Sequence, residues 1–535
     1  MTTSPNRLPR WLLVALVAPP GLFALVFYAA PVLTLLARAL TPGALADTLG
    51  DSDTWRVVWF TTWQAVLSTV LTIAVGLAPA YVCARYRFAG RRLLVGLLTG
   101  VFVLPTVVMG AAMLAVLPDS MERTVWAILA AHVLFNLAVV VRVVGAVWEH
   151  LPRELEHAAA TLGASPRQVA RHVTLPLLRP AIGAAGAIVF VFTFTSFGVV
   201  RILGGSGRTT VEVEVWRQAT QLDGIDVAAV LTVVQLLLVG GAVAWSLWIQ
   251  RRHRTTLALL TSADRQRPRT ARQRVLVAAT AAATALVVLI PLGAMFARSL
   301  RTPDGYSLAA WTDMGETEIR PGVRLGLDPT GAMLNSLRAA GLATLLAVVI
   351  GGLAALAIHS AGRHGRLLDA GLMLPLGTSA VTIGFGMLIT FDVDPIDWRA
   401  SPLLVPIGHA LIAVPFVVRT TLGVLAAIDP RLREAATTLG ATPVRAWAAV
   451  TLPALWRPLA VGAGLAGAIS LGEFGATSFL SRRDTETMPL AIEQLLGRTG
   501  SVLQAQGYAL AVILATATVA LVVFGELVRD RARRP

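Results

Sequence analysis

The sequence predicts an all-α polytopic membrane protein of about twelve transmembrane helices, arranged as two homologous six-helix halves. Three observations lead to this fold class. The 535 residues are 56% hydrophobic and only 14% charged, with a mean hydropathy of +0.70, which is typical of chains that cross a bilayer many times. Apolar runs of about 20 residues, long enough to cross the hydrocarbon layer, recur along the chain. A polar loop between two such runs occurs twice, at a fixed spacing.

The six spans of the first half follow one another with short connections. The first span could be mistaken for a cleaved signal, because Ala44-Leu45-Ala46 imitates a peptidase site. A cleaved signal has an apolar region of about 7–15 residues, so a retained membrane helix is favoured. The predicted spans are Trp11–Leu36, Val57–Ala84, Leu93–Leu117, Thr124–Trp148, Ile182–Leu203 and Val227–Ile249.

The second half repeats this count, so the predicted domains are residues 1–250, a basic linker at 251–274, and residues 275–535. We expect the linker to be a solvated tether, with contact to phosphate or lipid headgroups as the alternative. The long connection Arg301–Asn335 shows no clear secondary-structure period. The predicted spans are Val275–Ala297, Ser336–His359, Leu367–Phe391, Leu403–Ala427, Leu459–Leu480 and Gly507–Val528.

Charge and cysteine content restrict the chemistry. The net charge is +15, and all 45 basic residues are arginines that collect in alternate short loops. This distribution predicts a multi-pass protein with both termini in the cytoplasm, because basic loops stay inside. Without lysine the chain cannot form the G-x-x-x-x-G-K-[ST] phosphate loop, so any ATP hydrolysis must occur in another subunit. Cys83 is the single cysteine, which excludes intramolecular disulfides and thiolate metal clusters.

The second polar loop, Asp429–Pro458, predicts two short helices joined by a glycine turn. Asp429 can cap a helix that has Pro430 at its first position, and Gly440 can provide the left-handed residue that ends it. Thr442-Pro443 repeats the start signal. We expect the second short helix to end before Leu452-Pro453, because proline disfavours helix at the preceding residue.

The first polar loop, Leu151–Pro180, is a copy of the second. One constant separation along the chain, the repeat offset, relates Gly163 to Gly440, and it relates Pro166 and Pro176 to Pro443 and Pro453. The repeat offset also superposes Phe197-Gly198 on Phe474-Gly475 and Thr210 on Thr487. A fixed offset over these positions indicates a tandem duplication.

The two loops resemble the EAA loop of bacterial ABC importer permeases. In the second loop the matching residues are Glu434, Ala435, Ala436, Gly440, Leu452 and Pro453, and in the first they are His157, Ala158, Ala159, Gly163, Leu175 and Pro176. The resemblance implies a type I ABC importer permease fold in which each loop docks into an ATPase subunit. His157 departs from the pattern, and whether the neighbouring Glu156 substitutes for the expected acid is open. Amphipathic connectors at the membrane surface are the alternative, whereas a DNA-reading helix-turn-helix is excluded by the flanking spans.

This resemblance also implies the partners and the location. We expect two ABC ATPase subunits on the cytoplasmic side, one extracytoplasmic substrate-binding protein, the bilayer of a bacterial inner membrane, and no nucleic acid. The chain is expected to bind no cofactor or metal and to have no enzymatic activity, since ATP and Mg are used by the partner ATPase. Transport then proceeds by alternating access.

Two six-helix halves in one polypeptide resemble the ferric-iron and thiamine importers. The segment SLGEFGATSFLSR favours ferric iron, and thiamine or another small solute is the alternative. A carrier driven by an ion gradient is the alternative of another class, because duplicated halves occur there too. In that case Glu473 would be the coupling carboxylate.

Candidate pathway residues follow the two loops: Glu473 and Phe474 in the second half, and Ser196 and Phe197 in the first. A carboxylate within an apolar run normally faces a cavity or a polar partner, so Glu473 either attracts a cationic substrate or pairs internally, for example with Arg142 or Arg419. We expect His132, His409 and Asp369 to be structural or interfacial. The outer segments Thr210–Val215 and Thr487–Ile492 are either gate helices, a surface for the binding protein or short extended strands.

Overall fold

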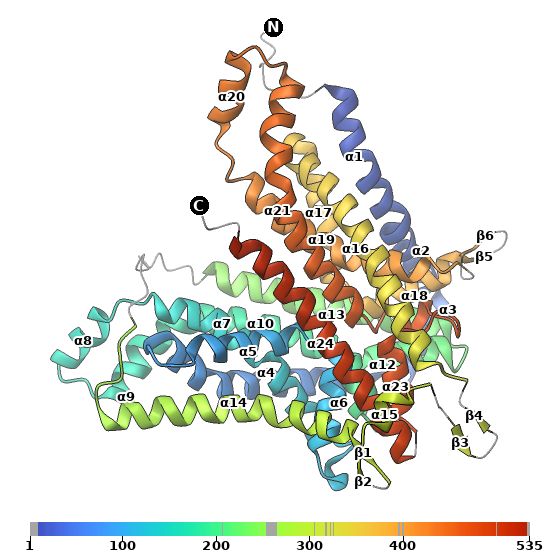
Figure 1. Cartoon of the computed structure of the whole chain (residues 1–535), viewed down its shortest axis with the longest axis horizontal. Helices are drawn as coiled ribbons and strands as arrows, with labels where there is room; N and C mark the ends of the chain where they lie inside the picture. Colours follow the sequence, from blue (N-terminus) through green and yellow to red (C-terminus); the bar gives the residue numbers. More distant parts are fainter. Residues whose placement is uncertain are drawn as a thin grey trace. The chain divides into compact units, whose positions relative to one another are not determined.

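A computed structural model describes residues 9–205, 207–252, 265–303, 305–315, 318–320, 323–324, 326–393, 396–398, 401–498 and 500–531. Within these ranges ten helices are long and apolar enough to cross a membrane, and two bent helix pairs raise the count to twelve if each pair is one span. The predicted all-α polytopic fold of about twelve helices is therefore confirmed (Figure 1).

Up to Ser299 the described residues form a nearly unbroken series of helices. Several helices reach beyond the predicted apolar runs, for example over residues 52–56 and 271–274, because helical hydrogen bonding continues into the polar ends. The elements are α1 (Arg10–Ala24), the π-helix η1 (Leu25–Ala29), α2 (Ala30–Ala39), α3 (Pro42–Gly50), α4 (Ser52–Arg85), α5 (Arg91–Val103), α6 (Thr106–Val116), the 3₁₀-helix η2 (Asp119–Met121), α7 (Val125–Glu149), α8 (Glu154–Thr161), α9 (Pro166–Val169), the π-helix η3 (Ala170–Thr174), α10 (Leu175–Phe194), α11 (Gly198–Leu203), α12 (Val211–Thr220), α13 (Ile225–Arg252) and α14 (Ala271–Ser299).

The remaining residues repeat this order of helices and add small hairpins. Asp328 caps the helix that begins at Pro329 by accepting hydrogen bonds from the Thr330 hydroxyl (2.6 Å) and backbone N–H (3.0 Å), and these bonds lower the pKa of the Asp328 carboxyl. The elements are β1 (Arg301–Thr302), β2 (Gly305–Tyr306), α15 (Ala309–Thr312), β3 (Glu318–Arg320), β4 (Val323–Arg324), α16 (Pro329–Ser360), α17 (Arg363–Gly377), α18 (Ala380–Phe391), β5 (Asp392–Val393), β6 (Ile396–Asp397), α19 (Leu404–Leu425), α20 (Pro430–Thr438), α21 (Pro443–Gly472), α22 (Thr477–Leu480), α23 (Met488–Leu496) and α24 (Ser501–Arg531).

Two sequence-based expectations are corrected by these elements. The predicted connection Arg301–Asn335 contains the antiparallel pairs β1–β2 and β3–β4 and the short helix α15. The predicted spans Ile182–Leu203 and Leu459–Leu480 are shifted, because α10 ends at Phe194 and α21 at Gly472. In each half a short helix, α11 or α22, follows the break.

The expected helix end before Leu452-Pro453 is also wrong. Helix α21 continues through Pro453 and Pro458, and in the first half the π-helix η3 leads directly into α10, with Pro176 in its first turn. The same arrangement precedes Pro31, where η1 leads into α2. Wider turns and neighbouring helices satisfy the backbone groups that a proline leaves unbonded, so a proline need not end a membrane helix.

Small residues bring the long helices close together in both halves. A Cβ atom on Gly76 of α4 would lie 2.7 Å from the Cβ of Val140 on α7, and one on Gly351 of α16 would lie 2.8 Å from the Cβ of Val417 on α19. The two valines are related by the repeat offset, and the two glycines nearly so. Close helix approach at small residues is the usual packing in membranes, and here the duplication predicted from the loops extends to the packing.

The compact units of the structure are not the same as the sequence halves. One unit contains residues 1–48, 215–232 and 299–535, and the other contains residues 49–214 and 233–298. Helix α1 therefore packs along α16 of the second half, while Val277 of α14 packs with Val82 and Tyr86 of the first half. The halves at 1–250 and 275–535 stay a prediction, because duplication is a property of sequence and compactness one of packing.

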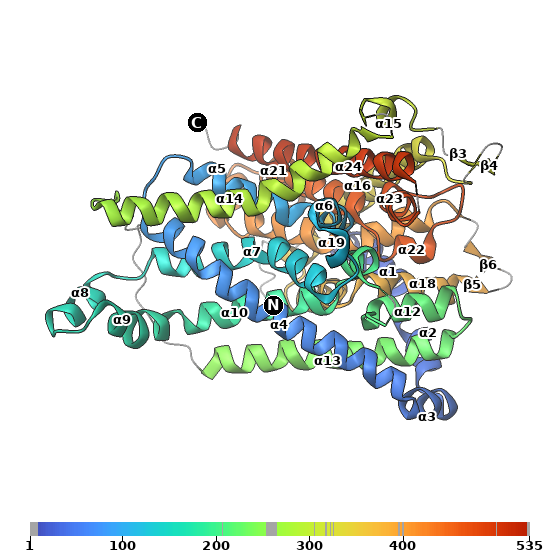
Figure 2. The same ribbon diagram turned by 90° about the horizontal axis from the view of Figure 1, so that it is seen from below.

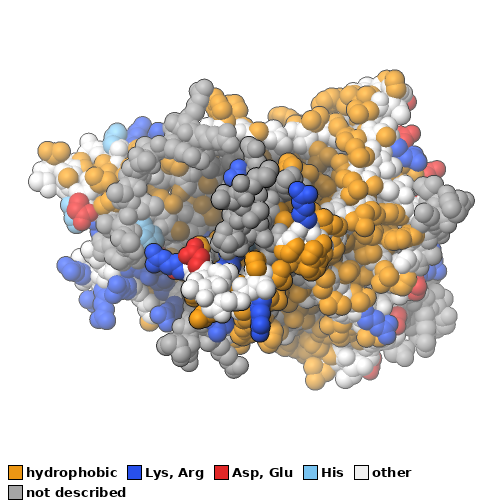
Figure 3. Space-filling model, turned by 90° about the horizontal axis from the view of Figure 1, so that it is seen from above, with side chains coloured by type: hydrophobic (Ala, Val, Ile, Leu, Met, Phe, Trp, Pro, Cys, Tyr) orange, Lys and Arg blue, Asp and Glu red, His pale blue; other side chains and the backbone are white. Residues whose placement is uncertain are grey.

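The surface of the structure agrees with a bilayer environment. Large hydrophobic side chains such as Trp11, Leu237 and Val275 are exposed by more than half, and Figure 3 shows a broad area where hydrophobic side chains predominate. In water such a surface would be an interaction site or an aggregation hazard. Lipid chains provide its natural solvent.

A close backbone approach in the second half is expected to be sensitive to a single methyl group. A Cβ on Gly384 of α18 would lie 2.6 Å from the Cα of Ala476. Because backbone cannot move aside as a side chain can, Gly384→Ala should lower the free energy of unfolding by about 1–3 kcal/mol. Thermal unfolding in detergent would measure this, and Gly371→Ala, which meets nothing within 4 Å, is the matched control. Equal melting temperatures for the two variants would contradict the close approach.

Candidate functional site

The second loop begins with the helix that its sequence predicts. The Asp429 carboxylate accepts a hydrogen bond from the Arg431 N–H (2.9 Å) ahead of Pro430. Helix α20 ends at Thr438, and Gly440 then adopts φ +87°. The Thr442 hydroxyl accepts a bond from the Arg445 N–H (3.4 Å) at the start of α21. Both caps satisfy backbone donors that a helix start leaves unbonded.

The first loop has the same geometry. Gly163 also has φ +87°, and the N–H of Ala164 bonds the carbonyl of Ala159 (3.1 Å), as the N–H of Ala441 bonds the carbonyl of Ala436 (3.1 Å). These are the bonds of a Schellman motif, in which a left-handed residue closes a helix. Ser165 and Gln168 then form a capping box for α9. Both loops are therefore rigid elbows, in which a short helix, α8 or α20, turns at a glycine into a helical arm that continues into a membrane helix, through α9 and η3 into α10 or within α21 itself.

Each elbow presents an apolar tip. Leu162 and Leu439, related by the repeat offset, are each 89% exposed. Figures 1 and 2 show α8 and α9 extending past the ends of α7 and α10. In the first loop, a hollow of about 340 Å³ lies beside the tip, between Leu162, Gln168 and His172. An exposed leucine on a rigid elbow suits insertion into a partner's groove.

The predicted coupling residues fall into two groups. Glu434, Ala435, His157 and Ala158 are exposed on the first arms of the elbows, and Ala436 and Ala159 are partly exposed there. The Leu175-Pro176 and Leu452-Pro453 pairs lie outside the elbows, in the long helices α10 and α21. The elbow residues can contact a partner directly, whereas the later pairs mark where each elbow joins a membrane helix.

The structure shows what Glu156, the acidic neighbour of His157, contacts. The Glu156 carboxylate accepts hydrogen bonds from Arg85 (Nη2, 2.7 Å) and from the Thr174 hydroxyl (2.9 Å). It is therefore turned toward α4 and η3 within its own unit, while Glu434 is exposed. Glu156 holds the first loop in place and leaves His157 at the exposed position.

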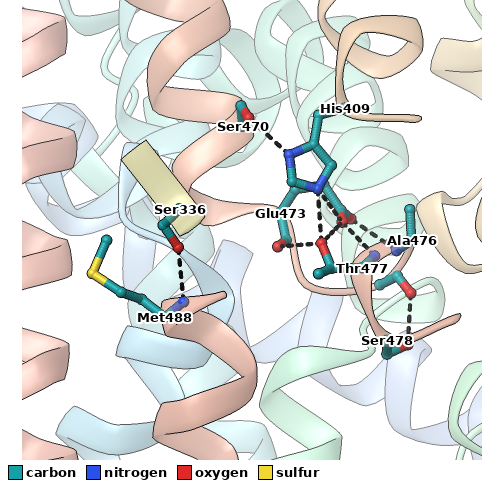
Figure 4. A network of polar contacts seen from close by, with 9 residues as sticks. Ser336, His409, Ser470, Glu473, Ala476, Thr477, Ser478 and Met488 are labelled. Carbon is teal, nitrogen blue, oxygen red and sulfur yellow. Dashed lines mark hydrogen bonds and ion pairs between the residues drawn. The ribbon is translucent and has the colours of Figure 1, made fainter. Parts of the chain in front are cut away.

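In each half a buried histidine contacts the break between two helices, α10 and α11 or α21 and α22. These contacts were not predicted. His132 bonds Ser68 Oγ through Nδ1 (3.1 Å) and Ser196 Oγ through Nε2 (2.9 Å). His409 bonds Ser470 Oγ through Nδ1 and Thr477 Oγ1 through Nε2, both at 2.7 Å (Figure 4). The repeat offset also separates the two histidines, so their repetition in the sequence was a usable signal.

Glu473 is the centre of a turn and not an isolated carboxylate. Its Oε1 accepts from the Ala476 N–H (3.1 Å) and its Oε2 from the Thr477 N–H (3.0 Å), with His409 Nε2 at 3.7 Å from Oε2 (Figure 4). These donors stabilise the charge where α21 ends and α22 begins. Of the arginines considered as partners, Arg419 pairs with Asp369 (3.2 Å), and Arg142 contacts Thr99 (3.5 Å).

All four predicted pathway residues are buried within their own units. Ser196, Phe197, Glu473 and Phe474 are at most 7% exposed. Ser196 and Glu473 contact the histidine of their own half. The structure thus brings each predicted residue to the helix break, and their role in transport stays a prediction.

The outer segments are helices, so the extended-strand alternative is wrong. Thr210–Val215 lies at the start of α12, and Thr487–Ile492 at the start of α23. The N–H of Val211 donates to Thr61 Oγ1 (2.9 Å), and the N–H of Met488 donates to Ser336 Oγ (2.7 Å; Figure 4). Beside α23, burial raises the pKa of Glu486. The start of each outer helix is thus tied to a long helix of its own half, α4 or α16, and whether these helices form a gate or a surface for the binding protein stays a prediction.

Comparison with known proteins agrees with the duplication. The sequence matches the family described as binding-protein-dependent transport system inner membrane component twice, over residues 72–252 and 339–534. The thiamine transport system permease protein ThiP of Brucella melitensis is 29% identical over 530 residues, covering 93% of this chain and 92% of that protein. ThiP of Escherichia coli is 27% identical, covering 84% of each. A crystal structure of a bacterial ABC transporter involved in the import of alginate aligns with a TM-score of 0.40 and 15% identity, over 46% of this chain and 96% of that one.

Proposed function

We propose that this chain, which belongs to the family of binding-protein-dependent transport system inner membrane components, imports thiamine as the fused permease of an ABC transporter. We infer the substrate from the similarity to thiamine permeases, which extends over both halves. For the Brucella melitensis protein it covers 93% of the chain. The preference for ferric iron came from one short segment. That segment includes Glu473, whose carboxylate accepts hydrogen bonds from two backbone N–H groups, so its charge has a structural use and gives iron little support.

The two elbows are proposed as the contacts with the ATPase, one subunit at each loop. Support comes from their repeated geometry, the exposed tips Leu162 and Leu439, and the absence of lysine from the sequence. A rigid elbow that continues into α21 or η3 and α10 can transmit the movement of a closing partner to membrane helices. ATP and Mg are then used by the ATPase, while the permease alternates between inward and outward access.

The loops and both termini are proposed to lie in the cytoplasm, with a single substrate-binding protein on the opposite side. The arginine clusters at residues 85–92, in both loops and at residues 265–274 support this orientation, because basic segments are retained on the cytoplasmic side. The outer helices α12 and α23 would then face the binding protein.

Uptake into proteoliposomes is the test of this function. With its ATPase and binding protein, the permease is expected to accumulate labelled thiamine only when ATP is enclosed with the ATPase, and an uncoupler should have no effect. Accumulation of labelled ferric iron in place of thiamine would overturn the assignment of thiamine as the substrate. Uptake that continues without ATP but stops with the uncoupler would instead indicate the ion-gradient carrier, with Glu473 as its carboxylate.

A further inference from the structure

The segment that joins the two halves returns to the fold beside the first loop. The N–H of Gln266 donates to the carbonyl of Arg85 (3.0 Å), and the N–H of Arg87 donates to the carbonyl of Gln266 (2.9 Å). Gln266 and Tyr86 thereby form a parallel bridge at the end of α4. The expected solvated tether, residues 251–274, is therefore corrected at this point, while residues 253–264 lie outside the described residues.

An ion pair reinforces this return. Glu149 is the last residue of α7, where the helix dipole disfavours a negative charge. Its Oε1 pairs with Arg265, and its Oε2 lies 3.4 Å from Arg91 Nη2. The Glu149 side chain is 14% exposed and that of Arg265 26%, so water screens the pair only partly. Arg265 thus stabilises the carboxylate of Glu149, which lies at the end of α7 where the helix dipole disfavours a negative charge.

Arg85 links the returning segment to the first loop. Its guanidinium, 3% exposed, bonds the Glu156 carboxylate (2.7 Å) and the carbonyl of Leu151 (3.1 Å). Its backbone carbonyl, which Gln266 contacts, also accepts a bond from Arg153 Nη2 (3.0 Å). The loop and the linker therefore share one buried residue as their support.

The second loop is held differently. Trp447, 7% exposed, is packed in a core cluster with Leu16, Leu425 and Leu455, and burial of an aromatic ring is a large apolar contribution. At the corresponding position the first loop has Ala170, which is exposed. The first loop lacks the aromatic anchor, and the linker contacts its polar anchor, whereas the polar contact of the second loop joins Arg433 Nη2 to His359 Nε2 of α16 (3.2 Å).

We propose that Arg265 and Gln266 brace the first loop, so that its elbow is held by the linker while the second is held by Trp447. This inference rests on the proposed function, in which both elbows must keep a fixed angle to move the membrane helices.

Distance measurements between spin labels test the brace without requiring transport. In a Cys83→Ala background of the full chain in nanodiscs, one label pair is Trp126→Cys with Leu162→Cys, and the other is Leu403→Cys with Leu439→Cys. The pairs correspond through the repeat offset, each lies within one compact unit, and all four positions are at least 51% exposed.

Arg265→Ala and Gln266→Pro are expected to broaden the distance distribution of the 126/162 pair and leave the 403/439 pair unchanged. The first removes the ion pair and the second removes the backbone N–H. Arg265→Lys should restore the narrow distribution, since only one terminal nitrogen is used. Arg267→Ala, an exposed neighbour, is the control with the same loss of charge.

Trp447→Ala should give the reverse result, a broadened 403/439 pair alone. The brace is overturned if Arg265→Ala leaves the 126/162 distribution unchanged, if both pairs broaden together, or if Arg267→Ala has the same effect. It is also overturned if Trp447→Ala broadens the 126/162 pair. If the permease shows the expected distances but binds no ATPase, the proposed function is contradicted and the brace is not.

Discussion

Replacing Gly440 with proline is expected to release the ATPase from the second loop while the permease stays in the membrane. Gly440 has φ +87°, in the left-handed region, whereas the proline ring restricts φ to negative values. The substitution also removes the N–H that bonds the carbonyl of Thr437 (3.0 Å). A cost of about 3 kcal/mol or more corresponds to binding weaker by about a hundredfold. Co-purification and titration of the ATPase on the permease in nanodiscs would measure it.

Matched variants separate the turn from general damage. Gly440→Ala keeps the N–H and should lose less, about 1–2 kcal/mol for a left-handed alanine. A Cβ at Gly440 meets nothing within 4 Å, and the same is true of Gly423 in α19, so Gly423→Ala is the control. Gly163→Pro should have the same effect at the first loop. Wild-type affinity in Gly440→Pro would show that the elbow is not the contact.

The elbows could be predicted from sequence because their signals are local. Asp429, Pro430 and Gly440 each act on backbone within a few residues, through a cap, a fixed φ or a left-handed turn. The structure has these features where the sequence places them. A copy at a fixed offset then provided independent support, since two loops are more informative than one.

The helix breaks after α10 and α21 were missed because hydropathy continues across them. Residues 195–197 and 473–476 interrupt the apolar runs with few polar side chains, chiefly Ser196 in one copy and Glu473 in the other. What ends the helices is the pair of buried networks around His132 and His409. Hydrophobic periodicity indicates whether a segment can be helical. It gives no information on side-chain hydrogen bonds from other helices that compete with the helical conformation.

The anchors of the loops were beyond sequence reasoning for a different reason. The Arg85 guanidinium reaches Glu156 from another helix, and Gln266 meets the end of α4 from a segment without periodic signal. Such contacts depend on which helices become neighbours. The first helix of each sequence half, α1 or α14, belongs to the compact unit that holds most of the other half. This could not be deduced from halves defined by repetition.

Removing the carboxylate of Glu473 is expected to cause a large loss of stability. In Glu473→Ala the buried N–H groups of Ala476 and Thr477 lose their acceptors, and each such group costs about 1–3 kcal/mol. His409 also loses the carboxylate at 3.7 Å. We therefore expect Glu473→Ala to express poorly and unfold at a much lower temperature than the wild type.

Glu473→Gln separates the structural role from a role in the substrate pathway. Its amide keeps one oxygen acceptor, so a capping role predicts an intermediate melting temperature, with thiamine uptake reduced in proportion to folded protein and an unchanged KM. A cation-attracting role predicts the opposite: normal melting behaviour and a raised KM, because the neutral amide no longer attracts the positive charge. Since the carboxylate already accepts bonds from two backbone N–H groups, we expect the first result. The second would return Glu473 to the pathway and reopen the choice of substrate.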